Sequence, residues 1–167
     1  MANVSEPSGT FRLIGDWTPE MIRNLNIIKK EWGGYFYNTE IEDDFEEAGT
    51  GLAFWGQGRW AYMYNLSGLG EATELSDKDE VRKAYRALSQ DMENHKARIQ
   101  VEYVDRERGC EVLYEATAEL FGQCGKIACE ETKYIEHEYS DENLDRLGYQ
   151  TYDEEGEWGD GEDECAV

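Results

Sequence analysis

The chain has 167 residues, of which 38 are acidic and 16 are basic, and its formal net charge at pH 7 is −22. Aromatic residues make up 13% of it, which excludes a wholly disordered acidic chain, because such chains contain few aromatics. The charge also opposes direct binding to nucleic acid or to an anionic membrane, and it favours basic partners.

Length and charge distribution predict one domain over residues 1–150 and a flexible acidic tail over 151–167. The tail, TYDEEGEWGDGEDECAV, is rich in Gly and Glu and has little apolar periodicity, which is typical of a mobile segment. It could equally serve only solubility. Residues 1–9 lack the features of a signal peptide, and no apolar run is long enough to span a membrane, so we expect a cytoplasmic protein.

The first predicted elements are a strand over Thr10–Gly15 and a helix that begins after Thr18. Thr is a favourable N-cap, and Pro19 suits the first helical position. One apolar stripe follows at helical spacing, and Gly33-Gly34 ends the helix. The stripe consists of Met21, Leu25, Ile28 and Trp32.

Residues 35–47, YFYNTEIEDDFEE, alternate in a way that predicts a strand with one packed and one acidic face. The packed face would hold Tyr35, Tyr37, Thr39, Ile41, Asp43 and Phe45. The other face would hold Glu40, Glu42, Asp44 and Glu46. Carboxylates this dense repel one another, so we expect the packed face to hold them in place.

The aromatic stretch Gly51–Leu66 predicts a second strand, bulged at Gly56-Gln57-Gly58 and paired with 35–45. Its aromatic side chains allow two interpretations. They could pack in the core and on the sheet, or some could be exposed as anchors for a partner, since Trp and Tyr dominate binding hot spots. The residues concerned are Trp55, Trp60, Tyr62 and Tyr64.

A second helix is expected to begin at Ser76, with Asp79 as its capping-box partner and Val81, Tyr85, Leu88 and Met92 as its apolar stripe. Three alternating segments then predict strands, and the first two are joined by a turn over 106–109. These strands are Ala97–Asp105, Glu111–Phe121 and Ile127–Tyr139, and a short helix over Ser140–Leu147 follows.

This order of elements predicts an α+β fold of the ferredoxin-like, split βαβ type (β-α-β-β-α-β). The additional C-terminal strands would extend its antiparallel sheet, and the acidic tail would follow. Such a fold hosts many unrelated functions, so function has to be inferred from the side chains.

Motifs for catalysis are absent from the sequence: it has neither a Gly-x-Ser-x-Gly turn nor a phosphate-binding glycine loop. Of its two histidines, His95 is expected on the surface. His137 lies between Glu136 and Glu138 and could accept a metal, although an acidic strand face explains it as well. Cys124 and Cys129 lie at the edge of zinc-type spacing, but no second pair follows. We therefore expect no enzyme, no catalytic residues, no cofactor and no dedicated metal site.

The acidic segments EIEDDFEE and YDEEGEWGDGEDE give the chain its distinctive character. In size and charge it resembles the small acidic DNA-mimic proteins that phages and plasmids use against host defence, the anti-restriction and anti-CRISPR inhibitors. The resemblance implies an inhibitor that fills the nucleic-acid groove of a CRISPR effector or restriction nuclease in the bacterial cytoplasm. The residues expected to bind this basic partner are Glu40, Glu42, Asp43, Asp44, Glu46, Glu47, Trp60, Asp153, Glu154, Glu155 and Glu157.

Other functions fit the same composition. A non-enzymatic adaptor or chaperone could bind a basic partner through exposed aromatics such as Trp60, with little dependence on salt. An inhibitor could also act allosterically without mimicking DNA, and the chain could be a generic acidic protein. The sequence indicates neither the partner's identity nor the oligomeric state.

Overall fold

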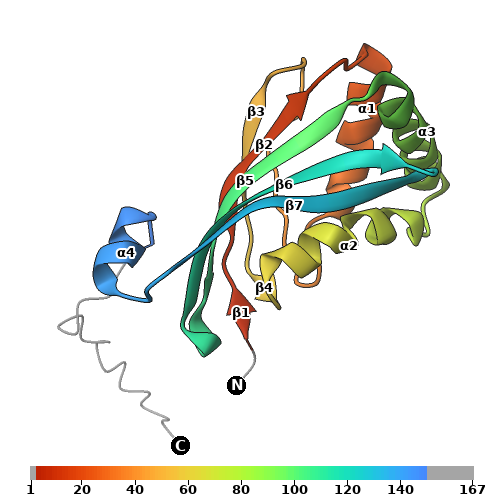
Figure 1. Ribbon diagram of the computed structural model, residues 1–167. Helices are drawn as coiled ribbons and strands as arrows, with labels where there is room; N and C mark the ends of the chain where they lie inside the picture. Colours follow the sequence, from red (N-terminus) through yellow and green to blue (C-terminus); the bar gives the residue numbers. More distant parts are fainter. Residues whose placement is uncertain (1–2, 150–167) are drawn as a thin grey trace, which may run out of the picture.

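A computed structural model describes residues 3–149 as an α+β fold with one strongly curled antiparallel sheet. In Figure 1 the sheet runs from β3 (Gly51–Trp55) through β2 (Ser8–Ile14), β5 (Arg98–Glu107) and β6 (Val112–Gln123) to β7 (Lys126–His137). Two short strands, β1 (Val4–Ser5) and β4 (Gly58–Arg59), pair with each other, and β1 also pairs with the end of β5.

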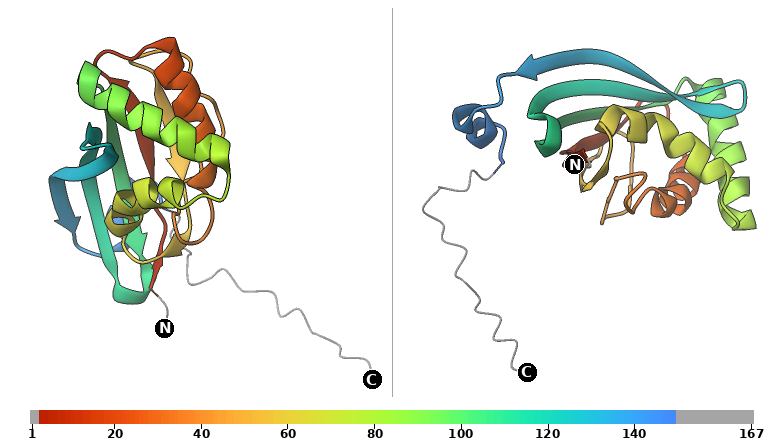
Figure 2. Two further views of the ribbon diagram at one scale, coloured as in Figure 1. Left: turned by 90° about the vertical axis from the view of Figure 1, so that its right-hand side faces the viewer. Right: turned by 90° about the horizontal axis from the view of Figure 1, so that it is seen from below.

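Three helices lie on one side of this sheet, α1 (Pro19–Ile28), α2 (Tyr62–Glu74) and α3 (Asp79–His95), as Figure 2 shows. A short 3-10 turn, η1 (Lys29–Glu31), continues α1; a second, η2 (Arg108–Cys110), joins β5 to β6; and α4 (Asp141–Arg146) follows β7. No helix in the described part of the chain is long and apolar enough to cross a membrane.

Side chains that alternate along β5 and β6 form the core beneath the helices. The apolar stripes of α1 and α3 pack against them. This confirms the buried helix faces that the sequence predicts. Among the most buried residues are Phe11, Met21, Leu25, Ile28, Trp32, Leu66, Leu88, Met92, Ile99, Val101 and Leu120.

The structure confirms several elements that local sequence patterns predict. Thr18 caps α1, with its side chain accepting the Met21 amide at 3.2 Å, and Pro19 opens the helix. The strands β5, β6 and β7 form as expected, and Ser140 caps α4. The turn between β6 and β7 places Cys124 and Gly125 at φ values of 51° and 77°, which matches the type I′ geometry that two-residue hairpin loops favour.

The ferredoxin-like prediction is wrong. Its second strand, residues 35–45, is a loop that makes only one isolated bridge, between Glu40 and Trp55. Its third, 51–66, ends as a strand at Arg59, and the chain continues as helix α2. Two consecutive helices therefore precede three consecutive strands, and the βαβ split is lost.

One helix start also differs from the prediction. The helix α3 begins at Asp79 with Lys78 at the N-cap position, and Ser76 lies two residues before that cap. The Ser76 hydroxyl accepts the Lys78 amide at 3.2 Å. It therefore closes the turn that enters the helix and does not cap the helix itself. The apolar stripe of α3 is nevertheless buried as expected.

Candidate functional site

The first candidate surface is the acidic loop, residues 40–47, which connects η1 to β3 and carries six carboxylates. Five of them are exposed: Glu42, Asp43, Asp44, Glu46 and Glu47. The predicted strand with one row of carboxylates does not form, so these groups are displayed by an irregular backbone. The sixth, Glu40, is half-buried and accepts the Gly34 amide at 3.0 Å.

Helix α1 holds this loop from beneath. The Asn26 side chain forms two hydrogen bonds of 2.9 Å with the backbone of Phe45, one from Nδ2 to the carbonyl and one from the Phe45 amide to Oδ1. The Phe45 ring is 2% exposed and belongs to the core. A loop that is fixed through its backbone and one buried ring presents its carboxylates in an ordered array.

A buried lysine forms the second anchor of the loop. Lys29 Nζ donates to the carbonyls of Ile41, at 3.2 Å, and Asp43, at 2.8 Å, and it lies 3.0 Å from Asp44 Oδ1. One positive charge beneath the loop offsets part of the repulsion among the carboxylates above it. The segment EIEDDFEE is therefore ordered because η1 supplies the Lys29 cation, α1 supplies the Asn26 amide, and the Phe45 ring is buried in the core.

We expect Asn26→Ala to loosen this loop without unfolding the protein. Losing two hydrogen bonds to the Phe45 backbone should cost about 1–2 kcal/mol of unfolding free energy. Hydrogen exchange of the Phe45 amide should accelerate. The matched control is Asn24→Ala in the same helix, because Asn24 makes no such bond to a described residue. Equal exchange rates in the two variants would contradict the anchoring role.

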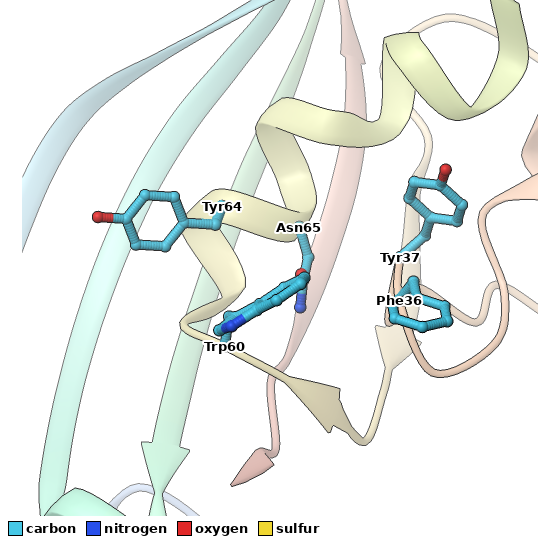
Figure 3. A pocket seen from close by; sticks show the side chains of 5 residues that line it. All are labelled: Phe36, Tyr37, Trp60, Tyr64 and Asn65. Atoms are coloured by element: carbon cyan, nitrogen blue, oxygen red, sulfur yellow. The ribbon is translucent and has the colours of Figure 1, made fainter. Parts of the chain in front are cut away.

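The second candidate surface is an aromatic groove of about 550 Å³ lined by Phe36, Tyr37, Trp60, Tyr64 and Asn65. Figure 3 shows Trp60 and Asn65 in the middle, with Phe36 and Tyr37 on one side and Tyr64 on the other. Trp60 is 49% exposed and Tyr64 is 74% exposed. Among the aromatics whose environment the sequence left open, Trp55, Trp60 and Tyr64 are thus on the surface and Tyr62 is in the core.

Glycines bring the two sides of the groove together. A Cβ atom at Gly58 would collide with the Tyr35 carbonyl, and one at Gly56 would collide with the backbone of Asn38. Only glycine therefore allows the loop that carries Phe36 and Tyr37 to lie directly on β4. The expected bulge at 56–58 is in fact a site of close backbone approach.

The backbone turns sharply from β4 into α2 at Trp60, whose φ is 65°. This left-handed conformation is costly for a bulky residue, and side-chain bonds on either side hold it. Asn65 Nδ2 donates to the Arg59 carbonyl at 2.9 Å, and the Tyr62 amide donates to Asp105 Oδ2 at 3.0 Å.

Asp105 is the buried centre of this end of the molecule and is 0% exposed. Its carboxylate also accepts from Ser5 Oγ at 2.8 Å, the Glu6 amide at 3.0 Å and the Tyr114 hydroxyl at 2.8 Å. Burial raises its pKa, and these donors act in the opposite direction. With its oxygens occupied by donors, Asp105 joins β1, α2 and β6 and has no free lone pair for catalysis.

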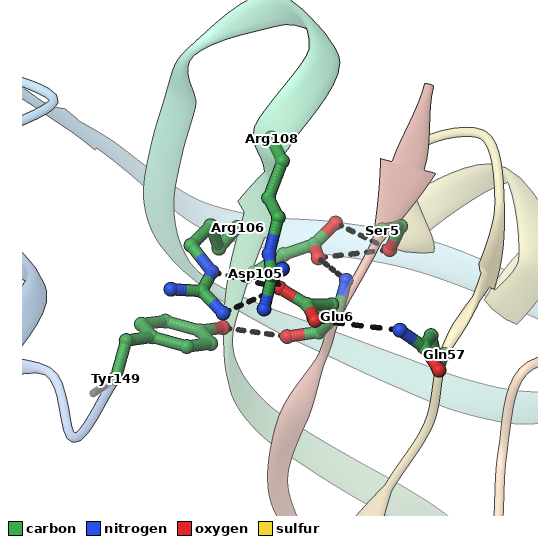
Figure 4. Close-up of polar contacts among 7 residues, drawn as sticks. All are labelled: Ser5, Glu6, Gln57, Asp105, Arg106, Arg108 and Tyr149. Atoms are coloured by element: carbon green, nitrogen blue, oxygen red, sulfur yellow. Dashed lines mark hydrogen bonds and ion pairs between the residues drawn. The ribbon is translucent and has the colours of Figure 1, made fainter. Parts of the chain in front are cut away.

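Beside Asp105, Glu6 forms ion pairs with two arginines (Figure 4). It accepts from Arg106 Nε at 2.7 Å and from Arg108 Nε at 2.8 Å. The Tyr149 hydroxyl donates to the Glu6 carbonyl at 2.6 Å, and the Arg106 guanidinium lies 4.6 Å from the centre of the Tyr149 ring. This ion-pair cluster fixes β1 against β5 and uses positive charge that would otherwise face solvent.

Within the described part of the chain, the cysteines and histidines do not come together. Cys124 lies in the exposed β6–β7 turn, and Cys129 lies in β7, where burial raises its thiol pKa to about 12. His137 contacts Glu115 at 2.7 Å, and His95 contacts Asp16 at 3.2 Å. Within residues 3–149 no group of three or more His, Cys, Asp or Glu side chains could hold a metal ion.

The predicted binding residues thus fall into three sets. Residues 40–47 form one continuous surface, Trp60 belongs to the separate aromatic groove, and Asp153, Glu154, Glu155 and Glu157 lie outside the described residues. Sequence reasoning missed Phe36, Tyr37 and Asn65 as groove residues. The one available signal was the run Tyr35-Phe36-Tyr37 directly after Gly33-Gly34, because aromatics in a glycine-rich loop are often exposed.

Comparisons of this chain with protein-family models, with curated proteins and with solved structures find no match. The inferences about function therefore rest on the geometry of the acidic loop and the aromatic groove.

Proposed function

We propose that this protein is a non-enzymatic inhibitor that occupies the basic nucleic-acid-binding groove of a protein partner. The single observation that supports it most is the ordered display of five exposed carboxylates on a loop held by Asn26, Lys29 and Phe45. An array that is ordered before binding loses less conformational entropy than a flexible one. It can therefore compete with the phosphates of a nucleic acid for the same Lys and Arg side chains.

The proposal extends to the setting that the charge and the resemblance suggest. The partner would be a host-defence nuclease, either a CRISPR effector or a restriction enzyme, in the cytoplasm of a bacterial host. The inhibitor itself would not bind DNA or RNA, because its net charge of −22 repels phosphate. Its affinity for the partner would fall steeply as salt rises.

The test reverses charge in the loop without touching its anchors. Glu42→Lys, Asp43→Lys and Glu46→Lys together change three exposed carboxylates that make no ion pair with a described residue. The matched control makes the same charge change elsewhere on the surface, at Glu93, Glu111 and Glu130, which are also exposed and unpaired within residues 3–149. Both variants should keep the wild-type melting temperature or exceed it, because like-charge repulsion is reduced.

Each immobilised protein is exposed to a bacterial lysate at low salt, and the captured proteins are identified. We expect wild type and control to retain a basic nucleic-acid-binding protein that duplex DNA elutes, and the loop variant to lose it. Deleting residues 151–167 should weaken capture less than the loop reversal. A partner that the loop variant still captures, or that DNA does not displace, would contradict the proposal.

The aromatic groove favours a second candidate, an adaptor or chaperone that binds its partner through exposed aromatics. This function predicts the opposite ranking. Trp60→Ala would abolish capture, the loop reversal would have little effect, and capture would persist at high salt, since burial of apolar surface is not screened.

A further inference from the structure

The aromatic groove combines features that a core-packing role does not explain. Among residues 3–149, its lining consists of four aromatic rings and one amide. Phe36 is 59% exposed, and its ring lies 6.5 Å from the centre of the Trp60 ring. Exposed rings that converge on one hollow are typical of a binding surface.

The ring faces and the charge of the whole protein both favour a cationic occupant. Aromatic faces carry negative electrostatic potential and attract cations, and the whole protein carries a net charge of −22. The chain already makes one such contact, because the Arg59 guanidinium lies 5.3 Å from the centre of the Trp60 ring. The Trp60 face therefore accepts a guanidinium within this very structure.

Asn65 adds a polar group at the base of the groove. Its Nδ2 is committed to the Arg59 carbonyl at 2.9 Å, and no described residue donates to its Oδ1. An amide oxygen beside a π surface suits a guanidinium, which can stack with its plane and donate from its edge. A lysine ammonium offers a point charge without the flat face.

We propose that the aromatic groove receives an arginine side chain from the basic partner protein. This inference rests on the proposed function for the basic character of that partner. It adds a specific contact to the proposed interface: the guanidinium stacks on Trp60 or Tyr64 and donates a hydrogen bond to Asn65 Oδ1. The acidic loop then supplies charge attraction, and the groove supplies the preference for arginine over lysine.

The experiment uses an oligoarginine and an oligolysine peptide of equal length at physiological salt. The readout is the indole N–H signals of Trp in the isotope-labelled full chain, with the Trp60 signal identified by Trp60→Phe. Charge alone would bind both peptides equally. We expect the arginine peptide to bind about two- to five-fold more tightly, as guanidinium stacking at an exposed aromatic site provides, and to shift the Trp60 signal more than that of Trp55.

Two variants bear directly on the groove. Phe36→Ala with Tyr64→Ala should remove the preference for arginine, whereas Trp55→Leu, which changes an aromatic that is 55% exposed outside the groove, should keep it. Arg59→Gln removes the competing guanidinium and should tighten arginine binding. Weaker binding of the arginine peptide by Arg59→Gln would mean that Arg59 does not compete for the Trp60 face, and this would overturn the inference.

Three other outcomes would overturn the inference. Equal affinities for the two peptides, or a preference that survives in the Phe36/Tyr64 variant, would overturn the arginine site. So would a shift of the Trp60 signal on deletion of residues 150–167 without peptide, since the chain's own C-terminal segment would then be the occupant. None of these results depends on partner capture through the acidic loop, so the proposed function can fail or hold separately.

Discussion

Replacing Asp105 by Asn should cost about 3–5 kcal/mol of unfolding free energy, because each buried donor left without an acceptor costs roughly 1–3 kcal/mol. The backbone amide of Glu6 donates to Oδ1 and that of Tyr62 donates to Oδ2. An amide side chain has only one oxygen, so its NH2 group must face one of these N–H groups. Urea unfolding at constant pH measures the loss, and Glu102→Gln, an exposed change on the same strand, is the control.

The same variant should alter the dependence of stability on pH. Burial raises the folded-state pKa of Asp105 above its value in the unfolded chain, so folding takes up protons in the interval between the two values. Wild-type stability should then decline as the pH rises through that interval. Asp105→Asn should lack this part of the decline. A loss below about 1 kcal/mol with an unchanged pH profile would mean that the carboxylate does not organise this end of the molecule.

Phe45→Ala should be nearly as damaging and should also weaken partner binding. The ring is 2% exposed, and truncating a buried Phe to Ala typically costs about 3–5 kcal/mol. Because this ring is the apolar anchor of the acidic loop, its loss should release the carboxylates into a mobile segment. Ordering that segment again on binding costs free energy, so the affinity for the basic partner should fall even where the domain remains folded.

Phe36→Ala is the matched control for the stability part of that prediction only, because Phe36 also lines the aromatic groove. It removes the same side chain from a position that is 59% exposed, so the change in stability should stay within about 0.5 kcal/mol. Thermal unfolding of both variants separates loss of the buried anchor from loss of an exposed aromatic ring, and partner capture by Phe45→Ala is compared with that of wild type. A folded Phe45→Ala protein that captures the partner as well as wild type would show that loop order is not needed.

Local patterns predicted the parts of the fold that local physics determines. The Thr18 cap, the stripe on α1 and the alternation in β5 and β6 depend on neighbouring residues, and all of them formed as expected. The segment 35–45 alternates like a strand, but the backbone of its last residues bonds to Asn26 of α1 and Lys29 of η1. No local signal shows that a helix will supply the hydrogen bonds of a later loop.

The prediction of a strand where α2 begins failed for a related reason. Trp60, Tyr62 and Tyr64 favour a strand by propensity, yet the helix begins at Tyr62, where the distant Asp105 accepts its amide. Tertiary contacts thus override propensity at the place where the aromatic groove forms. The acidic loop could be found from its charge alone, whereas the groove needed the fold to bring Phe36 and Trp60 together.

The position of β2 in the sheet has a consequence for how the chain reaches its native state. This strand lies between β3 and β5, and its register pairs Ser8 with Val104 and Ile14 with Arg98. A segment from the beginning of the chain therefore completes its pairing only after more than 80 further residues have been synthesised. Such non-local pairing slows folding towards milliseconds to seconds. During synthesis the edge of β2 that later pairs with β5 would remain unpaired, so this strand is where a nascent chain would most need protection from aggregation.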